Sequence, residues 1–150
     1  MRAPSKTSQG KPVDPLAAHL GYQLRRAAVL MQTDLSKRLS ELGVNMVEMS
    51  TLLIIEVNPG ISPAQIGRMI NVHRANMAPI TTNLVSRGLI EARPVDGRSI
   101  GLHLTQTGVA MVADIRVRVE ENEKILFRNI PPAQRQGLMD QINSIWSDDA

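Results

Sequence analysis

The sequence predicts a mainly α-helical fold that carries one small β-hairpin. Apolar residues recur every three or four positions through most of the 150-residue chain, as they do in amphipathic helices. One stretch departs from this pattern, because Asp96-Gly97 is a strong hairpin turn and Ile100, Leu102 and Leu104 alternate with other residues behind it. The length of the chain fits a single domain.

The first expected element is one long helix behind a short arm. Residues 1–13 mix Pro, Ser, Lys, Thr and Gly without periodicity and should form a flexible arm. Asp14-Pro15 predicts the helix start, since Asp caps free backbone N–H groups and Pro fits the first helical position. The apolar stripe continues to Gly43, a typical helix end. A helix over 14–43 is long for a small domain, so we expect a second subunit to pack against it.

Two shorter helices should follow, each opened by a capping box. In a capping box, the first side chain and the one three positions later satisfy each other's backbone N–H groups. Asn45 and Glu48 form the first pair, and the Pro-Gly dipeptide at 59–60 ends that helix. Ser62 and Gln65 form the second pair, with Pro at the first helical position between them.

A third short helix, the hairpin and two C-terminal helices complete the expected chain. Asn71 tolerates the left-handed backbone of a tight turn, and Gly88 is a typical end for the helix that follows it. The remaining elements are this helix over 74–87, strands over 89–93 and 100–104, a helix capped by Thr105 over 106–128, and a last helix that begins at Pro131-Pro132.

The middle of the chain is basic and uses only Arg. Residues 58–104 carry five Arg against two acids, a balance of +3, while residues 105–150 carry five bases against seven acids, a balance of −2. Arg suits bidentate contacts with phosphate and guanine better than Lys does. The five are Arg68, Arg74, Arg87, Arg93 and Arg98. They indicate a nucleic-acid surface only if they share one face of the fold.

Composition excludes several kinds of site. The chain has no Cys, so disulfides, thiol catalysis and Cys-zinc sites are excluded. Its three His are too scattered for a local metal pair, and its three aromatic residues are too few for a single-strand stacking platform. No apolar run approaches the ~20 residues of a membrane helix, and no paired-carboxylate or Ser/His/Asp arrangement indicates an enzyme. We therefore expect a cytoplasmic, non-enzymatic protein without metal or cofactor.

Two helices joined by a tight turn and followed by a hairpin make a winged helix-turn-helix. With long helices on both sides, residues 15–147 resemble the MarR (multiple antibiotic resistance regulator) family of bacterial transcription factors. The most specific part is the segment over 66–90 together with the wing. In the wing, the family's spacing is kept without a gap by Asp96, Arg98, Leu104, Thr105 and Gly108.

The resemblance implies one domain over 14–150 with two functional parts. These parts are a DNA-binding lobe over 45–105 and dimerisation helices over 14–43 and 106–147. The helix over 74–87 would be the recognition helix, and the residues expected to face the major groove are His73, Arg74, Ala75, Asn76, Ala78, Pro79, Thr82 and Asn83. The wing residues expected at the DNA are Arg93, Asp96 and Arg98, with Arg98 in the minor groove and Asp96 orienting it.

Two residues depart from the family pattern in the recognition helix. His73 is found where the family usually has a Ser or Thr cap, and Pro79 removes one backbone hydrogen bond within the helix.

Some of the candidate DNA contacts also have explanations that do not involve DNA. Arg74 can contact DNA or be a surface Arg, and the motif favours contact; Asn76 can read adenine or cap the helix locally. A hairpin turn alone explains Asp96, but it leaves an Arg at the tip unexplained.

The family often binds aromatic or phenolic acids between its dimerisation helices and its DNA-binding lobe. By this resemblance the effector-binding candidates are His19, Tyr22, Arg25 and Arg26. One Arg would meet the carboxylate, and Tyr22 would line the cleft. Surface Arg residues and a Tyr at the edge of the core explain the same pattern equally well.

The leading hypothesis is a homodimeric transcriptional repressor that binds a pseudo-palindromic operator in double-stranded DNA. A small organic acid or its thioester would release it. The alternative is a winged-helix module that docks protein partners without a small-molecule effector. The Arg-only middle segment favours DNA over a protein partner.

Overall fold

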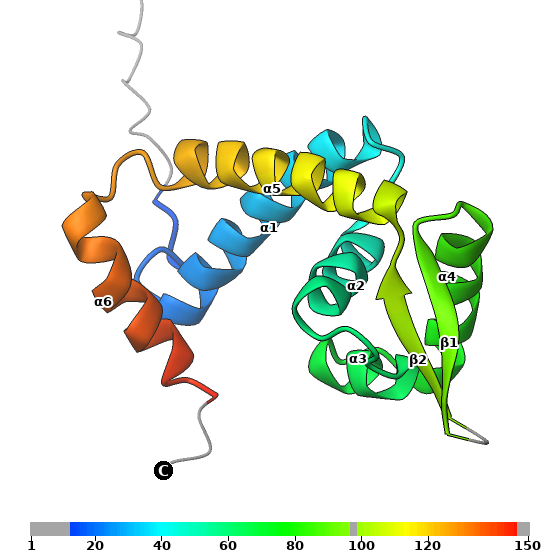
Figure 1. Cartoon of the computed structure of the whole chain (residues 1–150). Helices are drawn as coiled ribbons and strands as arrows, with labels where there is room; N and C mark the ends of the chain where they lie inside the picture. The colour runs from blue at the N-terminus through cyan, green and yellow to red at the C-terminus, as the bar shows by residue number, and fades with distance from the viewer. Residues whose placement is uncertain (1–12, 97–98, 147–150) are drawn as a thin grey trace, which may run out of the picture.

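A computed structural model describes residues 13–96 and 99–146, and within them it confirms the mainly helical fold with one antiparallel hairpin (Figure 1). The elements are α1 Leu20–Ser40, α2 Met46–Val57, α3 Pro63–Met69, α4 Arg74–Ser86, β1 Ile90–Asp96, β2 Ser99–Leu104, α5 Gln106–Leu126 and α6 Pro132–Asn143. The lobe of α2, α3, α4 and the hairpin lies at one end of α5, and α6 lies at the other end (Figure 1). The arm expected over 1–13 falls almost entirely outside the described residues.

The first helix begins later than the sequence predicts. The Asp14 side chain accepts a hydrogen bond from the backbone N–H of Leu16 (3.0 Å), which closes a separate turn. Helix α1 starts only at Leu20 and has no side-chain cap. The prediction of a helix from residue 14 is therefore wrong, because the same Asp hydrogen bond that can open a helix here stabilises a turn in front of it.

The turn between α1 and α2, residues 41–45, is called the elbow here, and it follows the predicted signals. Gly43 has the left-handed backbone expected of a helix end (φ 69°), and the N–H of Val44 donates to the carbonyl of Leu39 (3.2 Å). Asn45 then opens α2 directly with its capping box. The long helix is thus joined to the lobe by a short turn in which the backbone N–H groups from Leu42 to Asn45 all donate hydrogen bonds.

The hairpin and the start of α5 also confirm the sequence prediction. Strands β1 and β2 pair antiparallel from Ile90 opposite Leu104 to Asp96 opposite Ser99. The next residue, Thr105, caps α5 by accepting a hydrogen bond from the N–H of Gly108 (3.0 Å). The wing is therefore followed without a gap by the helix that leads back toward the terminal helices.

One apolar core joins α1 to α5 with the lobe. Its fully buried side chains come from every element between α1 and α5: Leu39, Leu52, Ile55, Ile66, Met77, Leu84, Ile90, Leu102, Val112 and Ile115. Helix α6 contributes none, because it has no buried residue. The lobe and the two long helices form one packed unit, to which α6 adds no core side chain.

Polar contacts also tie α1 to α5. Arg38 donates to Asp34 on its own helix (2.7 Å) and to Glu121 on α5 (3.0 Å). Asn122 of α5, only 3% exposed, donates to Asp34 as well (2.9 Å). The hydrogen bonds from Arg38 and Asn122 lower the pKa of the Asp34 carboxyl. Side-chain hydrogen bonds therefore fix the register of the two crossing helices.

The contact between α5 and the loop before β1 gives a test of the fold. A Cβ at Gly108 would lie 1.9 Å from the carbonyl oxygen of Leu89, and backbone cannot yield as a flexible side chain can. Gly108→Ala should therefore lower the free energy of unfolding by about 1–3 kcal/mol or more. Urea unfolding followed by circular dichroism measures this change.

Gly137→Ala is the matched control, because Gly137 is exposed on α6 and no atom lies within 4 Å of its Cβ position. Ala favours a helix over Gly, so this variant should gain up to about 1 kcal/mol. Both variants are compared at one protein concentration, because the stability of an oligomer depends on it. A Gly108→Ala protein as stable as the wild type would contradict the close contact.

Candidate nucleic-acid interface

The turn between α3 and α4 brings the two helices into close backbone contact. A Cβ at Gly67 would lie 2.6 Å from the carbonyl oxygen of Val72 and 3.1 Å from the side chain of Met77, so only Gly fits there. Asn71 adopts the left-handed backbone that the sequence predicts (φ 54°), and the N–H of Val72 donates to the Gly67 carbonyl (2.8 Å). The angle between α3 and α4 is therefore set by backbone packing.

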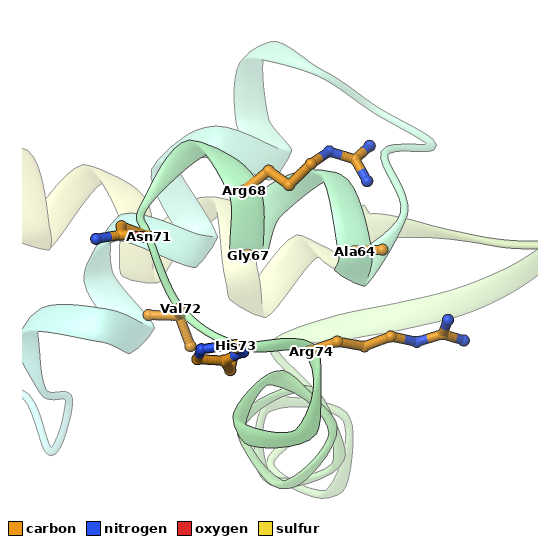
Figure 2. Close-up of a pocket in the computed structure, with 7 residues that line it drawn as sticks. All are labelled: Ala64, Gly67, Arg68, Asn71, Val72, His73 and Arg74. Atoms are coloured by element: carbon orange, nitrogen blue, oxygen red, sulfur yellow. The ribbon is translucent and has the colours of Figure 1, made fainter.

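Two arginines extend to the same side of this turn (Figure 2). Arg68 comes from α3 and Arg74 from the first position of α4, and both are exposed. They line a cavity of about 330 Å³ together with Ala64, Gly67, Asn71, Val72 and His73. Neither guanidinium forms an ion pair with a carboxylate in the described part of the chain. Both charges are thus available to an anionic partner.

Helix α4 has one buried apolar face and one exposed face. Met77 and Leu84 are fully buried in the core. The exposed residues on the rest of the helix include most of the predicted groove-facing set, namely His73, Arg74, Ala75, Asn76, Ala78, Pro79 and Thr82. The structure therefore leaves these seven positions accessible on a single helix.

The two unusual residues of α4 leave the helix intact. His73 occupies the N-cap position but its side chain accepts no capping bond, and its carbonyl accepts the N–H of Asn76 instead (2.8 Å). Pro79 lies on the exposed face, and the helix continues past it. The Asn76 side chain forms no hydrogen bond to any described group, so the alternative that it caps the helix locally is not supported.

Asn83, the eighth residue of the predicted set, is exposed as well, but it differs from the others in having a partner within the protein. Its side-chain N–H donates to Oε1 of Glu48 on α2 at 2.6 Å. The sequence pattern placed Asn83 off the apolar stripe, which is true, but it could not show that a buried carboxylate lies beside that edge of the helix.

Sequence reasoning missed Arg68 and the second role of Glu48. Arg68 was counted in the basic segment, and its position in the helix before the turn was the available signal, since that helix crosses the DNA backbone in helix-turn-helix proteins. Glu48 was recognised only as a capping residue. No sequence signal identifies its partner on α4, because 35 residues separate the two in the chain.

The three residues predicted at the wing differ in what the structure describes of them. Arg93 forms an ion pair with Glu91 on the same strand, so part of its charge is neutralised. Asp96 ends β1 opposite Ser99, as expected of a residue at the turn. Arg98 lies outside the described residues.

A groove of about 420 Å³ lies between β2 and α4. Its lining residues come from the start of α3, from α4 and from β2: Ser62, Pro63, Ala64, Arg74, Ala78, Thr81, Ser99 and Ile100. Arg74 lines both this groove and the cavity beside Arg68. Its side chain therefore borders both hollows on this side of the lobe.

The effector candidates lie around the first turns of α1, with His19 at its N-cap position, and none of them lines the cavity or the groove described above. His19, Arg25 and Arg26 are exposed and Tyr22 is half-buried. The guanidinium carbon of Arg26 lies 5.8 Å from the centre of the Tyr22 ring, and the same Arg pairs with Asp14 at 4.0 Å. One chain alone therefore brings two of the four together but does not enclose them.

The described residues, 13–96 and 99–146, contain no group of three or more His, Cys, Asp or Glu side chains that could hold a metal ion. No helix among them has the length and apolar character required to cross a membrane.

Known proteins resemble the chain in both sequence and structure. Residues 44–100, which span α2 to the start of β2, match the MarR family model. The HTH-type transcriptional repressor Rv2887 of Mycobacterium tuberculosis is 32% identical over 124 residues, which are 79% of this chain and 88% of the relative.

Two solved structures show the same fold bound to DNA. The transcriptional repressor CouR, bound to a 23-mer DNA duplex, superposes with a TM-score of 0.82 and 26% identity, over 91% of this chain and 100% of that chain. Rv2887 in complex with DNA superposes with a TM-score of 0.75 and 24% identity, over 87% of this chain and 99% of that chain. With its winged helix matched by the family model and a repressor matched over most of its length, this chain belongs to the MarR family of transcriptional regulators.

Proposed function

We propose that the protein is a repressor that reads an operator with α4 in the major groove and with the wing in the adjacent minor groove. The observation that carries this proposal is that Arg68 and Arg74 extend to one side of the helix-turn-helix (Figure 2) and form no ion pair with any carboxylate of the described residues. Arg68 would contact phosphate and Arg74 phosphate or guanine. Arg98 would enter the minor groove, whose potential is most negative where the groove is narrow.

The proposed repressor is a homodimer that binds two half-sites. Supporting this, the terminal helices and the turn after α6 carry large apolar side chains that remain exposed in one chain: Leu20, Leu30, Ile125, Met139, Ile145 and Trp146. A second copy is the natural partner, because closed two-fold dimers are the commonest oligomers. We assign 106–146 and α1 to this dimer contact and 45–105 to DNA. Two recognition helices about 34–36 Å apart would then enter successive major grooves.

The proposed effector is a small aromatic acid or its thioester, bound between the terminal helices and the lobe. Solved structures of the relative Rv2887 include complexes with salicylic acid and with p-aminosalicylic acid. In a dimer, His19, Tyr22, Arg25 and Arg26 would face a cleft that one chain leaves open. An acid held there would favour a separation of the two recognition helices that does not fit the operator.

The DNA surface is tested with Arg74→Ala and Arg98→Ala. Loss of a guanine contact by Arg74 should cost about 1–3 kcal/mol of binding and relax specificity at one position of each half-site. Loss of Arg98 should lower affinity and reduce the preference for A·T-rich flanks. Fluorescence anisotropy with duplexes selected by the wild-type protein measures both effects.

Lys37→Ala is the control for the loss of one positive charge, because Lys37 is exposed in the last turn of α1 and belongs neither to the proposed DNA surface nor to the effector candidates. It should bind DNA nearly as the wild type does. If both lobe variants are folded and bind like this control, the proposed DNA surface is wrong.

The dimer is tested by light scattering at micromolar concentration. We expect about twice the chain mass of 16.5 kDa, because burial of the exposed apolar residues stabilises the assembly. A stable monomer under these conditions would contradict the two-half-site model.

The effector is tested by calorimetric titration of salicylate into the free and the operator-bound dimer. Coupling between two sites is reciprocal, so a ligand that weakens operator binding tenfold, about 1.4 kcal/mol, must itself bind the DNA complex tenfold more weakly. Equal salicylate affinity in both titrations would exclude allosteric release by this acid. Benzyl alcohol, which lacks the carboxylate, serves as the control ligand.

A further inference from the structure

One carboxylate joins the start of α2 to the recognition helix. Glu48 is only 6% exposed, and its two carboxylate oxygens accept hydrogen bonds from different segments. Oε2 accepts the backbone N–H of Asn45 at 2.9 Å and so completes the capping box. Oε1 accepts the side-chain N–H of Asn83 at 2.6 Å and also lies 3.5 Å from Nη1 of Arg87.

The same network reaches the elbow. Arg87 follows the last residue of α4, and its second terminal nitrogen lies 3.7 Å from the Cβ position of Gly43, where α1 has just ended. Glu48 therefore lies where three segments meet: the elbow that follows α1, the first turn of α2 and the last turns of α4. A buried carboxylate tolerates little displacement of its donors, because each lost hydrogen bond leaves an uncompensated charge.

We propose that Glu48 is a positioning residue for DNA recognition: through Asn83 and Arg87 it sets the orientation of α4 and ties that orientation to the elbow. This inference rests on the proposed function, in which α4 enters the major groove. Glu48 itself is buried and contacts no DNA. In this proposal Asn83 acts through its hydrogen bond to Glu48. DNA binding should therefore tolerate an Asp at position 83 when residue 48 can donate a hydrogen bond to it.

An exchange of the two partners tests this role. In Glu48→Gln the capping box survives, because Gln is as good as Glu at that position, but Arg87 loses its anionic partner and the Asn83 amide must turn to present its oxygen to the Gln NH₂ group. In Asn83→Asp two carboxylates face each other. The double variant Glu48→Gln/Asn83→Asp restores one donor and one acceptor, keeps an anion beside Arg87 and has the net charge of the wild type.

Operator affinity is measured for the three variants with the duplex that the wild-type protein selects from a random-sequence library. Circular dichroism melting and light scattering establish that each variant is folded and in the oligomeric state of the wild type. We expect each single variant to bind about tenfold more weakly, and the double variant to return to within about threefold of the wild type, since directly contacting residues couple by this order. A residue needed only for stability would change the melting temperature and leave the affinity of the folded protein unchanged.

Ser86→Asp controls for the added negative charge. Ser86 is exposed in the last turn of α4, and its hydroxyl donates to the Asn83 carbonyl, not to Glu48. This variant should show only the electrostatic loss from one added acid near DNA, and Glu48→Gln should not rescue it.

Two results would overturn the positioning role. One is a double variant that binds no better than Asn83→Asp, as expected if Asn83 contacts DNA directly. The other is two folded single variants that bind like the wild type. Failure of the proposed function differs from both: the wild type would select no duplex, or Arg74→Ala would bind undiminished, and this inference would fall with it.

Discussion

The absence of a side chain at Gly67 is the constraint on which the DNA-binding surface depends. Because the backbone at Val72 lies against the position where a Cβ would stand, α3 and α4 meet at one angle only. That angle directs Arg68 and Arg74 to the same side (Figure 2). A larger residue would separate the helices and with them the two cations. The electrostatic character of the surface thus follows from a packing contact.

The arginines of the lobe differ in whether they form an ion pair with a carboxylate. Arg87 is engaged by the buried carboxylate of Glu48, and Arg93 by Glu91 on the neighbouring part of the wing. Arg68 and Arg74 have no such partner among the described residues. The four arginines of the basic segment that the structure describes therefore divide into two that pair with a carboxylate and two that do not, a division that net charge alone does not reveal.

Most local features of the fold were predictable from the sequence. Capping boxes and left-handed Asn or Gly positions involve residues no more than a few positions apart, and the structure confirms them at Asn45, Ser62 and Asn71. The start of α1 was not predictable in this way. A hydrogen bond from Asp14 to a nearby N–H serves equally in a helix cap and in an isolated turn, and no local signal separates the two.

By itself, the sequence determined the order of the elements, the winged helix-turn-helix and the outward face of most of the recognition helix. Periodicity and turn chemistry depend only on neighbouring residues, and this is why they could be read directly. Only the tertiary structure decided which polar side chains on that face are free. Asn83 and Glu48 are 35 residues apart in the chain and 2.6 Å apart in the fold. Such a contact arises when separate helices pack, and no pattern within one helix records it.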